Sequence, residues 1–252
     1  MTKLLHISDL HNRESCVSKL RYIEEHYPNH NIVDTGDSTD TGSISEYKWA
    51  HRELVARFGD KLFVVPGNHD YGNVFDSKVK AERFDDCFLT TYNKDNEMTH
   101  VWGLPGCLLI GLNSNPRTWG YWGDMARGKI GRAQRQDLQN MLAIYSEPII
   151  VTMHHHLKDP RAASPWKRLM DMLTKELLEL SDSRKVCRII EARKNVIVLH
   201  GHRHRQYNYR VGEVPVYCAG ALFKQSRALE ISVNSAGQVG TCYVPVEEAD
   251  ND

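Results

Sequence analysis

The stretch from Lys3 to His11 reads KLLHISDLH and joins a short apolar run to a polar triplet. An apolar run of this length that stops at polar residues is typical of a buried β-strand. The same arrangement recurs along the chain, with Asp, Asn or His close to the end of most runs. Strands are therefore predicted at residues 3–8, 31–35, 62–65, 107–112, 149–153 and 195–199.

Segments between these runs carry apolar side chains at helical spacing. Helices are predicted at residues 17–25, 46–57, 134–145, 167–180 and 185–193, and later strands at 215–219, 229–233 and 240–244. Turn-forming residues from Asn234 to Gly237 separate the last two strands and predict a hairpin. Strands that alternate with helices indicate an α/β domain built in layers.

The length of 252 residues suits one α/β domain. We assign residues 1–246 to this single domain and residues 247–252 to an acidic C-terminal tail. The longest irregular stretches, 72–96 and 113–131, are expected to be functional loops. The second contains Trp119, Tyr121 and Trp122, whose rings either stack on a base or sugar or form the core of their own loop.

The composition is that of a soluble globular protein, because 41% of the residues are apolar and 25% are charged. The 32 basic residues balance the 32 acidic residues, so no net positive charge favours nucleic acid as a partner. No apolar run is long enough to cross a membrane, and the N-terminus lacks the apolar core of a signal peptide. We therefore expect a cytoplasmic protein that acts on a small molecule.

Cysteine and histidine differ in how they are distributed. The six cysteines are scattered without a C-x-x-C pair, so reduced thiols are the simpler interpretation and three buried disulfides the alternative. Of the thirteen histidines, eight lie in or beside a few short loops. Clustered imidazoles indicate metal binding or acid–base chemistry.

The candidate metal ligands follow five of the predicted strands. They are Asp9, His11, Asp37, Asn68, His154, His202 and His204. Loops at the carboxyl ends of strands meet at one edge of an α/β fold, so these side chains are expected to converge. Carboxylate and imidazole together bind first-row divalent ions such as Mn, Fe, Co or Zn. An isolated Asp after a strand is more often a helix cap or a turn former, but five such loops in succession favour a metal site.

The motifs D-x-H, G-D-x-x-D, G-N-H-D, a lone His after a strand and G-H-x-H occur in this order between Asp9 and His204. This order resembles that of the calcineurin-like metallophosphoesterases. The resemblance implies a four-layer α/β/β/α sandwich of two mixed sheets flanked by helices. It also implies a binuclear centre of two divalent metal ions and hydrolysis of a phosphate ester by a metal-bound hydroxide.

The resemblance assigns a role to each matched position. Ligands of a first metal are matched by Asp9, His11 and His204. Ligands of a second metal are matched by Asn68, His154 and His202, and the carboxylate that bridges both ions is matched by Asp37.

Two further positions match residues that take part in catalysis. His69 matches an imidazole that faces the substrate from outside the ligand set and stabilises or protonates the leaving group. Asp40 matches the carboxylate that orients this imidazole and raises its pKa.

The residues beside the motifs are assigned from their position. Arg203 is predicted to contact the substrate phosphate, because arginine recognises phosphate well. His155 is predicted to support a ligand or to contact the substrate, and His156 to be structural or exposed. His200 is predicted to be packed and hydrogen-bonded, and Asp70 to have a turn or capping role.

The pattern from Gly36 to Gly42, G-D-x-T-D-x-G, and the run from Gly128 to Gln134 are similar to the bacterial cyclic-nucleotide and glycerophosphodiester phosphodiesterase branch of this superfamily. This branch implies that phosphodiesters are preferred over phosphomonoesters, and it leaves the physiological substrate open. The alternatives are a non-catalytic interaction scaffold with the same fold and a nuclease that acts on nucleic-acid ends.

Overall fold

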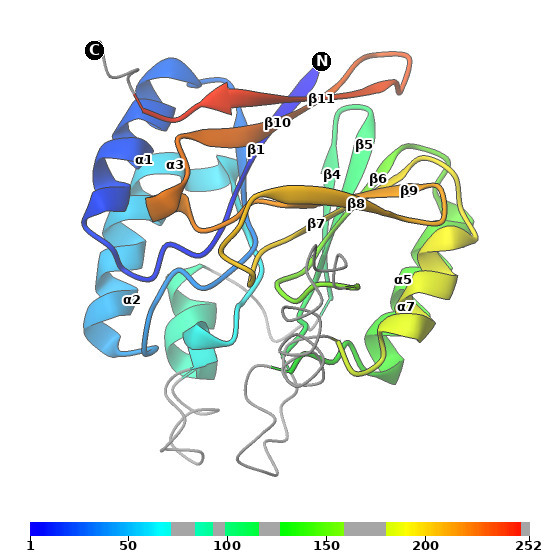
Figure 1. Ribbon diagram of the computed structural model, residues 1–252, viewed down its shortest axis with the longest axis horizontal. Coiled ribbons are helices and arrows are strands. Elements are labelled where there is room, and N and C mark those ends of the chain that lie inside the picture. Colours follow the sequence, from blue (N-terminus) through cyan, green and yellow to red (C-terminus); the bar gives the residue numbers. More distant parts are fainter. Residues whose placement is uncertain (72–83, 93–98, 116–126, 159–179, 248–252) are drawn as a thin grey trace, which may run out of the picture.

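The computed structural model describes residues 1–71, 84–92, 99–115, 127–158 and 180–247 (Figure 1). Strands in this part of the chain are β1 (Thr2–Ile7), β2 (Asn31–Asp34), β3 (Leu62–Val64), β4 (Thr99–Leu104), β5 (Cys107–Leu112), β6 (Ile149–Thr152), β7 (Val196–His200), β8 (Tyr207–Val211), β9 (Val214–Cys218), β10 (Arg227–Val233) and β11 (Val239–Pro245). The α-helices are α1 (Ser15–His26), α2 (Ile44–Ala50), α3 (Ala56–Phe58), α5 (Arg132–Ile144) and α7 (Ser183–Glu191).

The strands form two mixed sheets. The order of the first sheet is β11-β10-β1-β2-β3, and the order of the second is β4-β5-β6-β7-β9-β8. In the first sheet β1, β2 and β3 are parallel, and β10 and β11 continue it antiparallel. In the second sheet β5, β6, β7 and β9 are parallel, while β4 and β8 are antiparallel edge strands. The carboxyl ends of β1, β2, β3, β6 and β7 therefore carry the loops in which the candidate ligands lie.

Three apolar clusters separate four layers of structure. Because successive side chains of a strand point to opposite faces, Leu4 of β1 lies in the cluster between the two sheets, while Leu5 and Ile7 face α1 and α2. On the other side, Ile149 of β6 packs with Leu138 of α5 in the cluster beneath the second sheet. The α/β/β/α sandwich implied by the sequence is confirmed (Figure 1).

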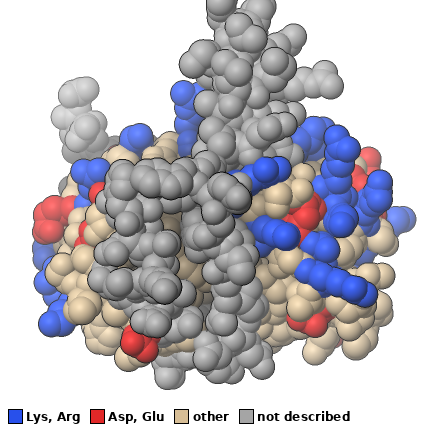
Figure 2. All heavy atoms as spheres, turned by 90° about the horizontal axis from the view of Figure 1, so that it is seen from below, with Lys and Arg blue, Asp and Glu red and all other residues tan. Residues whose placement is uncertain are grey.

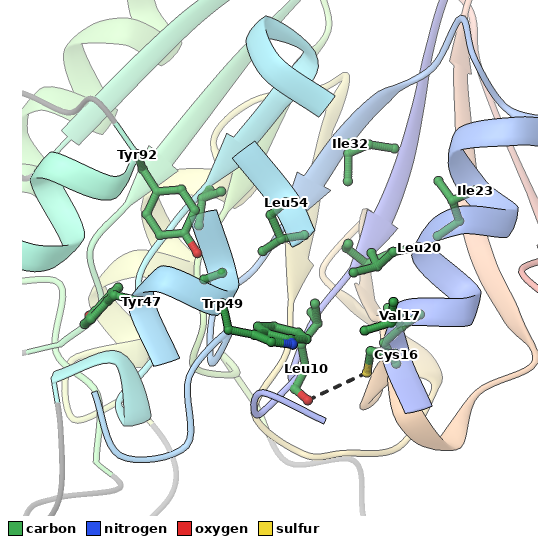
Figure 3. Packing of buried hydrophobic residues seen from close by; sticks show 14 of the residues in the cluster. Leu10, Cys16, Val17, Leu20, Ile23, Ile32, Tyr47, Trp49, Leu54 and Tyr92 are labelled. Atoms are coloured by element: carbon green, nitrogen blue, oxygen red, sulfur yellow. Dashed lines mark hydrogen bonds between the residues drawn. The ribbon is translucent and has the colours of Figure 1, made fainter. Parts of the chain in front are cut away.

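The cluster beneath α1 also anchors the first ligand loop. Val17, Leu20 and Ile23 are buried on one face of α1, and Figure 3 shows them directed at the apolar cluster that contains Leu10. The thiol of Cys16 donates a long hydrogen bond of 3.7 Å to the carbonyl oxygen of Leu10. The start of α1 is thus tied to the residue between Asp9 and His11.

The predicted elements agree with the structure in most places. The helix predicted at residues 46–57 extends over residues 44–58, where α2, a π-helical turn (His51–Val55) and α3 follow one another. It begins earlier because Ser43 caps it: the Ser43 hydroxyl accepts from the Glu46 amide, and the Glu46 carboxylate accepts from the Ser43 amide. The predicted hairpin turn between β10 and β11 is confirmed, since the Gly237 amide donates to the Asn234 carbonyl. The helix predicted at residues 167–180 lies outside the described residues apart from Leu180.

The elements that were not predicted include two strands and one π-helical turn. Strands β4 and β8 occupy the edges of the second sheet, where several side chains face solvent and the sequence lacks a continuous apolar run. The stretch 72–96 was predicted to be irregular, but it contains a π-helical segment, Asp85–Leu89, whose Phe88 is buried in the core. This prediction was wrong for that segment, because a short helix inside a polar stretch leaves too little periodicity to detect.

Three predictions outside the fold can also be compared with the structure. All six cysteines are free, so the reduced-thiol interpretation is confirmed and the three disulfides are not formed. Within the described ranges, no helix is long and apolar enough to cross a membrane. The first residue of the predicted tail, Glu247, is fixed by an ion pair of 3.0 Å with Lys19, and residues 248–252 lie outside the described part.

Candidate metal centre

The loops after β1 and β2 are joined by a ladder of main-chain hydrogen bonds. The amides of Asp9, His11 and Asn12 donate to carbonyl oxygens of Gly36, Asp37 and Ser38 at 2.9, 2.9 and 3.0 Å. The ladder holds the two motifs side by side, although they lie far apart in the sequence. It satisfies backbone groups that would otherwise be buried without partners.

Five of the seven candidate ligands have left-handed backbone conformations. The φ angles are 54° for Asp9, 49° for His11, 56° for Asp37, 71° for His202 and 50° for His204. Such conformations are uncommon for residues other than glycine, although Asp and His are enriched among the exceptions. Each costs on the order of 1–3 kcal/mol and persists only where the surrounding structure imposes it. The strain is concentrated at the residues predicted to hold metal.

Glycine next to the ligands allows the loops to approach closely. A Cβ atom at Gly67 would lie 2.1 Å from Oδ1 of Asp37, and one at Gly201 would lie 2.6 Å from Oδ2 of Asp9. Any larger residue would therefore push a candidate ligand out of place. The G-N-H-D and G-H-x-H motifs need glycine at their first positions for this steric reason.

The first group of ligands consists of Asp9, His11, Asp37 and His204, whose ligand atoms all lie within 4.8 Å of one another. Nε2 of His11 is 3.0 Å from Nε2 of His204, which in turn is 3.3 Å from Oδ1 of Asp9. Asp9 is fully buried and also accepts the His202 amide at 3.0 Å. These atoms can surround one ion.

The second group consists of Asp37, His154 and His202, with Asn68 beside them. Nε2 of His154 is 3.1 Å from Oδ1 of Asn68, from Nδ1 of His202 and from Oδ2 of Asp37. Nδ1 of His154 donates to the carbonyl oxygen of Thr35 at 2.8 Å, so a neutral ring presents a lone pair at Nε2. Several lone pairs then point at one place, which is an arrangement that a cation stabilises.

The electrostatics of both groups fit a bound cation. Burial opposes the charged form of His154, but the carboxylates of Asp37 and Asp9 outweigh this effect and raise its pKa to about 9. Burial likewise opposes ionisation of Asp37, yet the neighbouring His154, His69 and His11 lower the pKa of this carboxyl. Positive charge is thus stabilised where the ligands meet, and the mixture of carboxylate, imidazole and amide oxygen suits a first-row divalent ion.

Asp37 lies between the two groups. Its Oδ2 is 3.1 Å from Nε2 of His154 and 3.8 Å from Nε2 of His11. Its Oδ1 accepts the amide of His69 at 2.8 Å, which fixes the orientation of the carboxylate. This placement agrees with the bridging role that the resemblance implies.

Asp70 connects the G-D-x-x-D and G-N-H-D loops, a wider role than the turn or capping role predicted for it. Its Oδ2 accepts the amides of Asp37 and Gly67, both at 2.9 Å, and its Oδ1 accepts the amide and hydroxyl of Thr39, both at 3.0 Å. Burial raises the pKa of Asp70 to about 6, with Asp37 adding to the effect. Four donors, one of them the amide of Asp37, therefore converge on one buried carboxyl.

His69 lies outside both groups, with its ring centroid 4.6 Å from that of His11 and 40% of its side chain exposed. Its Nδ1 donates to the backbone carbonyl of Asp40 at 2.7 Å, whereas the Asp40 carboxylate is 3.9 Å away. That carboxylate instead accepts from Nδ1 of His11 at 3.1 Å. The expectation that the carboxylate of Asp40 orients His69 is therefore corrected: the backbone of Asp40 does so, because its side chain is turned to His11.

The other histidines of the two loops lie behind the ligands. His155 is buried, with Nδ1 2.8 Å from the hydroxyl of Ser114 and its ring centroid 4.6 Å from that of His202. This position fits support of a ligand rather than the substrate contact that was the other alternative. His156 is buried, as is His200, whose Nδ1 lies 2.9 Å from the carbonyl oxygen of Gly201. Arg203 is half-buried in the last loop.

Two residues near the candidate ligands, Gln134 and Phe223, were given no role in the sequence analysis. Gln134 accepts the amide of Asn113 and donates to the carbonyl oxygens of Asn113 and Ile130, which joins the loop after β5 to α5. Phe223 lies edge-on to His11 and His204, with ring centroids 6.2 Å from each. The run from Gly128 to Gln134 and the place of Gln134 at the start of an amphipathic helix were the signals for this residue, and Phe223 gave none.

Comparison with known proteins places this geometry in a family. Residues 2–206 match the sequence profile described as calcineurin-like phosphoesterase. The chain belongs to this family. The resemblance drawn from the five motifs is thereby confirmed.

Individual relatives of this calcineurin-like phosphoesterase are distant. The chain is 27% identical over 129 residues to the probable glycerophosphodiester phosphodiesterase GpdQ of Arcobacter nitrofigilis, a match that covers 49% of this chain and 44% of that protein. Less than half of the curated relative is therefore covered.

Solved structures support the fold. A putative 5'-nucleotidase from Staphylococcus aureus superposes with a TM-score of 0.60 and 16% identity, covering 100% of this chain and 55% of that one. The protein TT1561 of Thermus thermophilus superposes with a TM-score of 0.59 and 15% identity, covering 98% of this chain and 99% of that one. Likeness at this level of identity concerns the fold alone.

Proposed function

We propose that this phosphoesterase is a binuclear, metal-dependent hydrolase of a phosphodiester or phosphomonoester of a nucleotide or another small molecule. The observation that carries the proposal is the position of Oδ2 of Asp37, 3.1 Å from Nε2 of His154 and 3.8 Å from Nε2 of His11. One carboxylate oxygen within reach of both ligand groups suits a ligand shared by two ions. The candidate ions are Mn, Fe, Zn and Co.

When bound, two such ions would polarise the phosphate and activate a water for attack. The residues of the chain contribute binding, orientation and proton transfer. The side chain of His69 is 40% exposed and lies beside His11, and its Nδ1–H donates to the Asp40 carbonyl, so we assign its free edge to the substrate. The proton available for the leaving oxygen is therefore the one on Nε2. We assign Arg203, in the loop between His202 and His204, to binding of a phosphate oxygen, because arginine recognises phosphate well.

We favour a phosphodiester over a phosphomonoester as the substrate. The curated relative is named as a probable glycerophosphodiester phosphodiesterase, and the G-D-x-T-D-x-G pattern from Gly36 to Gly42 is of the same branch. Free cysteines agree with a cytoplasmic location, which we propose as well.

The experiment is a substrate panel with protein reconstituted separately with each of the four ions. The panel contains generic monoester and diester reporters, cyclic nucleotides, glycerophosphodiesters and a phosphopeptide, and metal content is measured by elemental analysis. We expect up to two ions per chain, chelator-sensitive turnover and detectable cleavage of diesters. A metal content near zero together with activity that survives chelation would contradict the metal-dependent mechanism, and a clear preference for the phosphopeptide would contradict the choice of substrate.

A further inference from the structure

A basic cavity of about 820 Å³ lies between the first turns of α5 and α7. Its positively charged lining consists of Arg127, Lys129, Arg132, Arg135, Arg184 and Lys185. Figure 2 views the molecule from below, and Lys and Arg gather on the half of this face where α5 and α7 lie. A cavity lined by one sign of charge concentrates the electric field and attracts counter-ions.

The acidic residue in the described lining, Asp182, neutralises only one of these six positive charges. Its two carboxylate oxygens accept the amides of Ile130 and Gly131, each at 3.1 Å, and the carboxylate is paired with Arg135. Asp182 and Arg135 thus cancel one another. The remaining five cations form no ion pair or side-chain hydrogen bond with any described residue, and all but the half-buried Arg127 are exposed.

The cavity adjoins the metal centre through one strip of backbone. Gly128, between two of the lining cations, packs on His155 so closely that a Cβ atom there would lie 2.4 Å from its Cγ. The ring of His155 in turn lies 4.6 Å from that of His202, centroid to centroid. The amide of Ser181, also in the cavity lining, donates to the Gly128 carbonyl at 2.8 Å. The wall of the cavity therefore continues into the wall of the candidate metal centre.

We propose that this basic cavity binds the phosphate groups of a small polyphosphate-bearing ligand. Its volume falls within the range of about 300–1,000 Å³ that small-molecule sites occupy. Arginine offers planar, multiple donors that match phosphate oxygens, and three of the five unpaired cations are arginines. The positive charges surround one cavity, and the chain as a whole has no net charge. This arrangement suits a compact anion better than the extended backbone of nucleic acid.

Direct binding to the metal-loaded protein tests the proposal without requiring turnover. The probe is a pyrene trisulfonate dye, followed by fluorescence anisotropy and displaced with inorganic tripolyphosphate. We expect the double variant Arg184→Ala/Lys185→Ala, and independently Arg132→Ala on α5, to weaken dye binding, the double variant by at least about tenfold. The matched control is Arg188→Ala, which removes an exposed charge from the same helix outside this cavity and should bind the dye as the wild type does.

The source of the phosphate is distinguished by kinetics with two diester reporters, one of which carries a second, non-scissile phosphate. If the double variant raises KM only for the reporter with the second phosphate, the cavity binds part of the substrate. If the double variant loses dye binding while KM stays unchanged for both reporters, the cavity binds a separate ligand. Both outcomes support the site. Three outcomes would overturn the proposed site. Dye affinity could be unchanged in the double variant, or Arg188→Ala could lose as much dye affinity as the double variant does. The third outcome is that duplex DNA displaces the dye and tripolyphosphate does not. An enzyme inactive on every ester would contradict the proposed function and leave the binding result standing.

Discussion

The two sides of the candidate metal centre are built in different ways. On the first side, the loops after β1 and β2 are held by main-chain hydrogen bonds and by the carboxyl of Asp70. On the second side, the loops after β6 and β7 pack histidine rings against one another, with centroid distances of 4.6 Å for His155 and His202 and 6.2 Å for His156 and His200. Burial lowers the pKa of His200 to about 4 and lowers those of His156 and His202 as well.

The two sides also differ in the kind of ligand that they supply. The first side supplies the carboxylates of Asp9 and Asp37, which carry the negative charge that a cation needs. The second side supplies imidazoles: burial lowers the pKa of His202, which stays neutral and offers a nitrogen lone pair, while Nε2 of His154 lies against the Asp37 carboxylate. Among the seven candidate ligands, only Asp37 belongs to both ligand groups. The comparison predicts that loss of Asp37 affects both groups and that loss of another ligand affects mainly its own group.

The largest effect is expected for Asp37→Ala. Removal of the shared carboxylate should abolish turnover and lower the occupancy of both ions, because each group loses a charged ligand. Asn68→Ala is the matched comparison, since it removes a neutral ligand from the second group alone and should leave roughly one ion bound. Elemental analysis of both variants, with circular dichroism to establish folding, checks this. Near wild-type turnover in a folded Asp37→Ala protein would remove Asp37 from the centre.

The next effect, on chemistry rather than on binding, is expected for His69→Ala. Metal content should stay nearly intact while kcat falls by about 10²–10⁴-fold, the usual contribution of a positioned acid. Esters of poorly departing alcohols should suffer more than esters of acidic phenols, because the phenolate leaves without a proton. His11→Ala is the control, since it should lose metal. Equal losses of kcat for both leaving groups would mean that His69 only binds phosphate.

The sequence predicted the fold and the ligand candidates because both depend on local signals. An apolar run followed by Asp9-Leu10-His11 contains the strand and its ligands within nine residues. The features that the sequence did not predict depend on contacts between segments that are far apart in the chain. The Asp40 carboxylate turns to His11 rather than His69, and Asp70 receives donors from the preceding loop, since those choices are made when the loops pack. The basic cavity likewise exists only after α5 and α7 are brought together.

A smaller effect on the first side is expected for Asp70→Asn. An amide accepts at one end only, so two of the four donors would face an NH₂ group, and backbone amides cannot turn away. The loops that carry Asp37 and Gly67 should loosen, and metal affinity should fall by about 10–100-fold, as for residues that support ligands. Calorimetric titration of the metal-free protein with Mn measures the change.

Asp34→Asn is the matched control for Asp70→Asn. Asp34 is equally buried and burial raises its pKa to about 8, so it is largely neutral at pH 7, as an amide is. One of its oxygens accepts from the Gly36 amide and the other from the Ser38 hydroxyl, which can rotate and accept instead. Metal affinity should therefore change little. A loss as large as that of Asp70→Asn would show that any buried polar change disturbs the centre.

The smallest effect concerns the stability of the first sheet, away from the metal centre. Glu230 on β10 accepts from His30 at 2.7 Å and pairs with Lys3 on β1 at 3.3 Å. Burial opposes its ionisation, but these two partners lower the pKa of Glu230 below the ordinary 4.5. A lowered pKa in the folded state means that the stabilisation is complete above about pH 4.5 and is lost as the pH falls through the lower, folded value. Glu230→Gln should cost about 1 kcal/mol of unfolding free energy at neutral pH, and the gap from wild type should close in acid.

Urea denaturation at several values from about pH 6.5 to pH 3.5 measures this gap. Glu213→Gln is the control, because Glu213 is fully exposed and its pair with Arg210, at 3.7 Å, is screened by water. It should leave the unfolding curve unchanged at every pH. If instead the gap caused by Glu230→Gln widened towards acid, the folded-state pKa of Glu230 would be raised rather than lowered, and its contacts with His30 and Lys3 would not stabilise the ionised form.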